Sequence, residues 1–383
     1  MKLMKLACVP LALLAVGIIR ALAPWKRVRL GQLWSPRLGH LIGNTECYLC
    51  ERDALIQPRS YDIWFHSGII CNRVIARKYG ELLHLWPAFF ANLVVKVNAL
   101  FLGWEKHMVQ SAQVDRDIYN LTRLFSPHIR FTESEERKGQ RLLRKLGIPE
   151  GAKWVCLIVR DSAYLKIKSP GADFSYHDYR DSDISDYIPA AVELARRGYY
   201  VVRMGEVIGK TLLVKHSRVI DYALGKRTEF GDLYLGAKCA FCLGTSTGFM
   251  VIPQVFNRPV GIVNYVPVEY TPTWLEGLVI WKHHLKDGKK MALPEIVQAG
   301  VGLTTFGHAF ADAGITLQDN SSLEILDLAI EMADRDERIY VEEPQTKFWE
   351  AFPRSMVNGK PLHGKIRIRV GREFFKGLCE SAS

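Results

Sequence analysis

The chain has 383 residues, 48% of them hydrophobic, so it is long enough for about two or three domains and too apolar to be disordered throughout. Its net charge of +11 favours anionic partners such as phosphorylated ligands or lipid headgroups. The charge gathers near the two ends and no nucleic-acid-binding motif is present, so we expect no nucleic-acid partner.

The amino-terminal segment combines an apolar run, residues 6–19, with positive flanks. The run is short for a membrane-spanning helix, which needs about 20 residues. The dense positive cluster after it opposes export, which favours an uncleaved helix over a cleaved signal peptide. We therefore predict a membrane-associated apolar helix over residues 1–25, drawn to an anionic membrane surface. The flanking basic residues are Lys2, Lys5, Arg20, Lys26, Arg27 and Arg29.

Residues 26–130 are predicted to form an amino-terminal α/β domain. Val28–Leu33 and Asp62–His66 are predicted to be strands. A helix is expected from about Asn44 to Asp53, and most of residues 72–119 is expected to be helical. Few strands are recognisable, so a Rossmann-like sheet in this half is an inference from the α/β alternation.

Residues 131–340 alternate strands and helices more clearly, which predicts a second Rossmann-like domain with a parallel sheet. The last expected helix begins with a capping box, Ser321 and Glu324. Residues 341–383 are predicted to be a basic tail. The expected strands are Trp154–Val159, Tyr199–Met204, Val219–Asp221, Cys239–Leu243 and Pro259–Asn264, and the expected helices are 133–146, 184–197, 232–237 and 321–335.

Two Cys-x-x-Cys pairs occur, Cys47 with Cys50 and Cys239 with Cys242. A zinc site is one interpretation of such pairs. The second pair lies in a predicted strand, where residues three apart face opposite sides and do not bind one ion. We favour reduced, mostly buried thiols.

Ligands of open α/β sheets bind outside the carboxyl ends of the strands. Three segments of the second half directly follow predicted strands and are therefore expected at this edge of the sheet. An arginine offers a charged fork for a diphosphate, and a turn of small residues leaves backbone N–H groups free for phosphate at a helix start. Each segment also has a structural interpretation, as an ion pair or a surface turn. The candidate donor-binding residues are Arg160, Asp161, Arg203, Ser246, Thr247 and Gly248.

In the first half, four polar residues follow the opening strand. His40 or Glu46 could act as a general base that deprotonates an acceptor hydroxyl. A structural role is the alternative for a single histidine. Arg37 and Asn44 are assigned to the acceptor side.

Several motifs together resemble a family of bacterial glycosyltransferases found with surface-polysaccharide genes. The resemblance covers about Val28 to Arg335 and implies a two-domain transferase resembling the GT-B fold, with a nucleotide-sugar donor. A more distant likeness to fucosyltransferases carries over only Arg160, because the histidine of their His-x-Arg triplet is replaced by Ile158. The matching segments are 37–49, 155–164, 176–184, 198–205, 232–239, 246–248, 259–267 and 271–274.

Metal-dependent sugar transferases hold the donor diphosphate through a cation bound by an Asp-x-Asp pair. Such pairs occur at Asp115/Asp117, Asp181/Asp183 and Asp334/Asp336. Their helical or helix-entry contexts favour structural roles, so we predict no metal and no other cofactor.

The function expected from the resemblance is transfer of a sugar from a nucleotide-sugar donor to a glycan acceptor, in lipid-linked form, at the cytoplasmic face of the inner membrane. Arg160 and the Ser246–Gly248 turn would hold the donor diphosphate, and His40 or Glu46 would assist attack at the anomeric carbon. The alternative is a non-catalytic, membrane-associated glycan assembly factor that retains a transferase-like fold.

Overall fold

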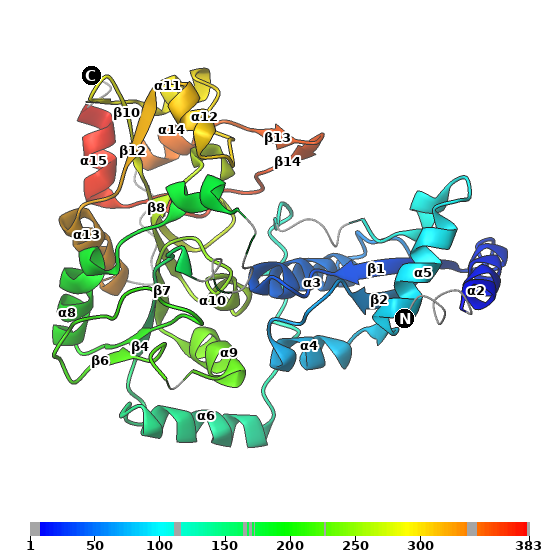
Figure 1. The fold of residues 1–383 in the computed structure, drawn as a ribbon. Helices are drawn as coiled ribbons and strands as arrows, with labels where there is room; N and C mark the ends of the chain where they lie inside the picture. Colours follow the sequence, from blue (N-terminus) through cyan, green and yellow to red (C-terminus); the bar gives the residue numbers. More distant parts are fainter. Residues whose placement is uncertain are drawn as a thin grey trace. The chain divides into compact units, whose positions relative to one another are not determined.

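The computed structural model describes residues 8–110, 116–163, 167, 171, 173–225, 227–334 and 343–380. The chain divides into two compact units, Met1–Asp117 with Leu121–Arg130, and Ile118–Asn120 with Phe131–Ser383 (Figure 1). Each unit contains a parallel β-sheet with helices, so the mixed α/β class is confirmed. No helix among these described ranges is both long enough and apolar enough to cross a membrane.

The amino-terminal unit is built on a three-stranded parallel sheet in the order β1-β2-β3. Arg27 pairs with Ser60 and the register holds to Leu33 opposite His66. The helix expected from Asn44 begins six residues earlier, because burial outweighs the weak helix propensity of its glycines. The elements are α2 (Val9–Ala21), β1 (Arg27–Leu33), α3 (Leu38–Asp53), β2 (Ser60–His66), α4 (Arg73–Gly80), β3 (His84–Leu85), α5 (Ala88–Asn98) and the 3-10 turn η1 (Trp104–His107).

Helix α2 is part of the hydrophobic core of this unit rather than a separate segment. Ala12, Val16 and Ile19 are buried against residues of β1, β2 and α5. These three positions follow the spacing of one helix face. The predicted membrane-associated helix over residues 1–25 therefore contributes one face to the core of the α/β unit, and its association with a membrane stays a prediction.

The carboxy-terminal unit has a seven-stranded sheet in the order β15-β9-β8-β7-β4-β5-β6, in which every neighbouring pair is parallel. All five strands expected from the sequence are present within a few residues of the predicted bounds. The strands of this sheet are β4 (Trp154–Ile158), β5 (Tyr200–Arg203), β6 (Val219–Asp221), β7 (Phe241–Gly244), β8 (Val260–Tyr265), β9 (Gly277–Trp281) and β15 (Arg369–Val370).

Helices cover both faces of this sheet (Figure 1). Val155 and Leu157 of β4 pack in one core with residues of α8 and α13. On the opposite face the Trp154 indole N–H donates to the Leu235 carbonyl of α9, 3.0 Å away. The α-helices of this unit are α6 (Glu133–Lys145), α8 (Ile188–Arg196), α9 (Glu229–Lys238), α10 (Val251–Val255), α11 (Leu293–Gln298), α12 (His308–Asp312), α13 (Ser322–Ala333), α14 (Glu343–Ala351) and α15 (Arg372–Glu380).

Short elements complete the unit. The expected capping box at the start of α13 is confirmed, with Ser321 and Glu324 exchanging hydrogen bonds. A small antiparallel sheet has the order β11-β10-β12. The remaining elements are β10 (His283–Lys286), β11 (Lys289–Lys290), β12 (Ile315–Gln318), β13 (Met356–Val357), β14 (Lys360–Pro361), η3 (Ser175–Arg180), η4 (Ile184–Tyr187) and η5 (Val268–Tyr270).

The prediction of a basic tail over residues 341–383 is wrong for the described part, 343–380. Strand β15 pairs with β9 and extends the main sheet, and α15 packs against α13. The Gln345 side chain bonds the backbone of Val370 on both its N–H and its carbonyl. The basic side chains of this segment are therefore carried by elements that complete the domain.

All eight cysteines are free thiols, which agrees with the preference for reduced cysteines. Cys239 precedes β7, while Cys242 lies within the strand and both are buried. Cys47 and Cys50 lie on α3, where residues three apart share a face.

Candidate functional site

The main sheet of the carboxy-terminal unit reverses its strand order between β4 and β7. From β4 the chain builds outward through β5 and β6, then returns to the other side of β4 to add β7, β8 and β9. The carboxyl ends of β4 and β7 are therefore neighbours at a topological switch point, the position where open α/β sheets bind ligands.

Gly244 allows the two strand ends to lie this close. Its φ is +147°, and a Cβ there would stand 1.7 Å from the carbonyl oxygen of Ile158. The turn that follows runs along the end of β4, and the Thr245 hydroxyl accepts from the Arg160 N–H at 2.8 Å. The segments expected to bind phosphate after β4 and after β7 are thus hydrogen-bonded to one another.

Arg160 follows β4 at this edge of the sheet, and an ion pair fixes its side chain. Its Nε donates to Asp181 Oδ1 at 3.0 Å, and its side chain is 17% exposed. Burial and the neighbouring charge of Arg180 lower the pKa of Arg160, against the opposing effect of Asp181. The ion-pair partner is Asp181 and not Asp161. The guanidinium is thus partly desolvated and close to a second positive charge.

Arg180 brings the second guanidinium to the same turn. Its Nη2 donates to the Ser246 carbonyl at 3.1 Å. The Thr247 hydroxyl oxygen in that turn is buried and has no hydrogen-bond partner in the described part of the chain. Two guanidinium groups and an unpaired hydroxyl around one turn form a set of donors suited to phosphate oxygens.

A buried polar network fixes the segment that carries Arg180 and Asp181. Lys282 Nζ donates to the Asp181 carbonyl at 2.8 Å and pairs with Asp319 at 2.6 Å. Asn264 Nδ2 donates to the Ser182 hydroxyl at 2.8 Å. Such a satisfied network is rigid, so it holds the two charges in place before any ligand arrives.

Two residues assigned to donor binding have structural partners instead. The Asp161 carboxylate accepts hydrogen bonds from the N–H groups of Ala163 and Gly209, both at 2.9 Å. These bonds stabilise the loop that contains Asp161. Arg203 has a side chain only 3% exposed and pairs with Asp221 at 3.1 Å. Because its guanidinium is buried in an ion pair between neighbouring strands, Arg203 does not present a fork to a ligand.

The expected contribution of a helix dipole to the turn also needs correction. Helix α10 begins at Val251, after Gly248, and is five residues long. A helix this short has a weak dipole, and its start lies beyond the turn. Positive charge at this site comes from the arginines.

In the amino-terminal unit, three of the acceptor-side candidates lie along α3, and Arg37 precedes it. The His40 ring is half-buried, packs edge-on to Trp34 and lies with Nδ1 3.4 Å from Asn44 Oδ1. Glu46 is 1% exposed and is bonded through both carboxylate oxygens, to His128 and Tyr79. The geometry thus favours His40 over Glu46 as a base that a substrate can reach.

The Asp-x-Asp pairs do not form a cation site in the described residues. Asp181 pairs with Arg160, and Asp183 caps η4 through the Ser185 N–H and pairs with Lys210. The Lys210 contact is the main cause that lowers the pKa of Asp183 to about 2. Asp117 accepts from two backbone N–H groups, while Asp115 and Asp336 lie outside the described residues.

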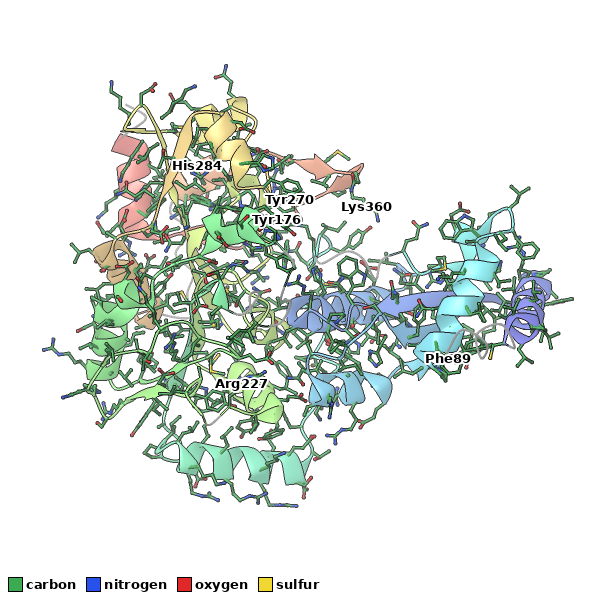
Figure 2. The ribbon with its side chains drawn as sticks, viewed as in Figure 1. Phe89, Tyr176, Arg227, Tyr270, His284 and Lys360 are labelled. Atoms are coloured by element: carbon green, nitrogen blue, oxygen red, sulfur yellow. The ribbon has the colours of Figure 1, made fainter. Side chains whose placement is uncertain are left out.

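An apolar cavity of about 880 Å³ lies beside the end of β9 in the same unit. Its polar border includes Lys282 and the ion pair between His283 and Glu324, 2.8 Å apart. His284, labelled in Figure 2, is 2% exposed, and burial lowers its pKa to about 4. The lining suits an apolar or aromatic group and not a phosphate. Its aromatic residues are Trp281, Phe348, Phe374 and Phe375.

Sequence reasoning missed Arg180 and Lys282 as site residues, and it identified the turn that contains Thr245 without assigning that residue a contact. Arg180 lies in the resemblance motif Tyr176–Ile184, so the motif contained the signal but not the position of its side chain. Lys282 follows β9, which was not recognised as a strand. Strand order decides which loops meet, and it is not readable from local pattern.

No protein-family model matches the chain, and no curated protein matches it. Three solved structures are similar over much of the chain. A glycosyl transferase of family 9 from Veillonella parvula has 12% identity and a TM-score of 0.45, over 80% of this chain and 97% of that one. The ADP-heptose lipopolysaccharide heptosyltransferase II of E. coli has 12% identity and a TM-score of 0.42, over 75% and 97%.

The iron-containing dodecameric glycosyltransferase TibC of enterotoxigenic E. coli has 13% identity and a TM-score of 0.37, over 69% of this chain and 64% of that one. All three are glycosyltransferases by description. At such identities and TM-scores the likeness carries no argument about activity, so a function has to be derived from the residues of this chain.

The buried position of Arg203 makes a prediction about stability. We expect Arg203→Met to lower the free energy of unfolding by about 3 kcal/mol, because it leaves the Asp221 carboxylate without its positively charged partner. The matched control Arg196→Met removes a side chain that is 74% exposed and should change little. Urea unfolding followed by circular dichroism measures both. If Arg203→Met were as stable as the original chain but no longer bound nucleotides, Arg203 would be a ligand-binding residue and not a structural one.

Proposed function

We propose that the protein is a glycosyltransferase whose nucleotide-sugar donor binds at the switch point between β4 and β7. The observation that carries the proposal is the pair of guanidinium groups, Arg160 and Arg180, at the turn Thr245–Gly248. A diphosphate supplies the negative charge and the oxygen acceptors that this turn lacks. The resemblance to surface-polysaccharide transferases and the parallel α/β sheet in each of the two units agree with this proposal.

The arginines would act on the leaving group. When the bond between the anomeric carbon and the diphosphate breaks, negative charge develops on the phosphate oxygens, and fixed guanidinium groups stabilise it. Arg160 is held by Asp181 before the donor arrives, so little reorganisation is needed. We propose that these charges, not a divalent cation, stabilise the nucleoside diphosphate.

The acceptor side is proposed to lie in the amino-terminal unit. His40 is the proposed base, with Arg37 and Asn44 as further acceptor contacts. Its half-buried ring is held against Trp34, and an imidazole nitrogen can accept the proton of an acceptor hydroxyl. The proposed acceptor is a glycan in lipid-linked form, and the chain would act at the cytoplasmic face of the inner membrane. A non-catalytic glycan assembly factor is the alternative.

An exposed apolar surface on α2 supports the proposed location. Opposite its buried face, α2 carries an apolar stripe at helical spacing, Leu11, Leu14 and Ile18, which are 57%, 61% and 52% exposed. Arg20 at the end of the helix donates to the carbonyl of Leu102, itself 96% exposed. A helix with exposed apolar side chains and a basic residue at its end is suited to lie against an anionic membrane surface.

The donor site is tested first. We expect a screen of nucleotide sugars to give at least one that raises the melting temperature, by binding the folded state. Arg160→Ala should lower the transfer rate about a hundredfold, as loss of one preorganised donor does. Arg160→Lys should keep part of the binding, since it keeps the charge but not the fork. Calorimetry and product formation measure the two effects.

Controls separate the site from general effects. Arg196→Ala, on the exposed face of α8, should leave affinity and rate unchanged. Donor affinity should be the same with magnesium and with chelator. Unchanged donor affinity and turnover in folded Arg160→Ala would contradict the donor site, and tight donor binding without transfer or hydrolysis would favour the assembly factor.

The stripe on α2 is tested by sedimentation with vesicles. Full-length protein should pellet with phosphatidylglycerol-containing vesicles, and Leu11→Gln, Leu14→Gln and Ile18→Gln together should weaken binding roughly a hundredfold, at about 1 kcal/mol for each partly buried side chain. Leu213→Gln, at a position 82% exposed in the other unit, is the matched control. If the triple variant pellets like the original chain, α2 does not bind the membrane.

A further inference from the structure

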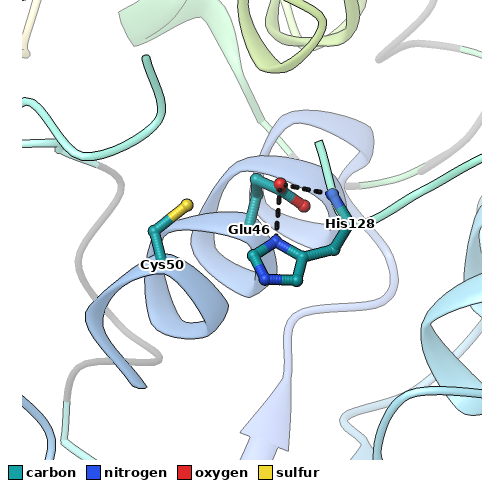
Figure 3. Close-up of side chains that lie close together, drawn as sticks. All are labelled: Glu46, Cys50 and His128. Atoms are coloured by element: carbon teal, nitrogen blue, oxygen red, sulfur yellow. Dashed lines mark hydrogen bonds and ion pairs between the residues drawn. The ribbon is translucent and has the colours of Figure 1, made fainter. Parts of the chain in front are cut away.

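One face of helix α3 carries three side chains that could bind a metal ion or support its ligands. Glu46, Cys50 and Asp53 follow one another at helical spacing, so their side chains project to the same side. His128, from the segment at the end of the amino-terminal unit, lies against this face (Figure 3). A carboxylate, a thiol and an imidazole are thereby brought together in the interior of one unit.

The three groups are close enough to share an ion. One atom from each of Glu46, Cys50 and His128 lies within 4.8 Å of the other two. Zinc binds sulfur at about 2.3 Å and nitrogen or oxygen at about 2.0–2.2 Å, so side-chain movements of about 1 Å would close the set around the ion. Glu46 and Cys50 are each 1% exposed, so the ligands are shielded from water.

The contacts around the cluster match the support that metal ligands receive. His128 Nδ1 faces Glu46 at 2.9 Å, while its Nε2 lies 3.0 Å from Asp53 Oδ2. A ligating histidine commonly donates its second ring N–H to a carboxylate, which fixes the tautomer and the ring orientation. The second oxygen of Glu46 accepts from the Tyr79 hydroxyl at 3.0 Å, which orients the carboxylate.

The local charge also favours a cation. Three acidic side chains of α3, Glu46, Glu51 and Asp53, lie within four positions of Cys50. A divalent ion bound beside these carboxylates would be stabilised by their charge. Arg52 pairs with Asp53 at 3.1 Å.

We propose that Glu46, Cys50 and His128 bind a divalent ion of the zinc type, with Asp53 as the carboxylate that positions His128. The mixed oxygen, sulfur and nitrogen set suits zinc or a similar late first-row ion and is unsuited to magnesium or calcium. On binding, the ion replaces the thiol proton of Cys50 and any proton between His128 Nδ1 and Glu46. The ion would tie α3 to the segment Leu121–Arg130. This site does not depend on the proposed sugar transfer.

Cobalt serves as the probe for the ligand set. Full-length protein is stripped with chelator, dialysed and titrated with Co²⁺, then with Zn²⁺. We expect one equivalent of Co²⁺ to produce thiolate-to-metal charge-transfer absorption and the visible bands of a tetrahedral ion, and Zn²⁺ to remove both. Cys50→Ser and His128→Gln should abolish the charge-transfer signal and weaken binding about a hundredfold or more, while Asp53→Asn should weaken it about 10- to 100-fold.

Cys379→Ser, at an exposed thiol of the other unit, should leave the titration unchanged. X-ray absorption of the zinc-loaded original chain needs no variant, and we expect one sulfur ligand with the rest nitrogen or oxygen. A Co²⁺ spectrum that persists in Cys50→Ser, a sulfur-free zinc shell, or no binding by the stripped protein would overturn the site. In each of those cases the cluster is a hydrogen-bonded bridge between α3 and His128.

Discussion

Two guanidinium groups lie at the edge of the main sheet but only one of them is ion-paired, and the proposed chemistry depends on this imbalance. Asp181 pairs with Arg160, whereas Arg180 has only the carbonyl of Ser246 as its partner in the described residues. Burying charge costs free energy, and an uncompensated positive charge at a partly buried site favours an anion. The surrounding network keeps the imbalance in place, because Lys282 binds both Asp319 and the backbone of Asp181.

The strands of the carboxy-terminal unit were the most predictable part of the chain. Buried parallel strands are continuous apolar runs, and Trp154–Ile158 is such a run. Arg160 and the turn at Ser246 could be identified because they directly follow such strands. Arg203 also follows a strand but pairs with Asp221, and a local pattern cannot distinguish a ligand-binding arginine from a buried ion pair.

Long-range partners explain what the sequence could not predict. Strand β15 is two residues long and exists because β9 offers it a pairing edge. The same applies to Glu46, which was proposed as a base because it follows the opening strand. Its partners Tyr79 and His128 are 33 and 82 positions away in the chain, and they turn an apparently reactive carboxylate into a buried acceptor. Contacts at such separations have no local signature.

The central claim is that a nucleoside diphosphate binds at the switch point, and hydrogen–deuterium exchange tests it most directly. The full chain is compared with and without a saturating nucleotide ligand found by the thermal-shift screen. We expect slower exchange in peptides that cover Gly244–Met250 and Tyr179–Ser182, because a bound diphosphate occupies the turn and orders both arginines. Saturating binding with no change in either segment, or with protection confined to other loops, would contradict the claim.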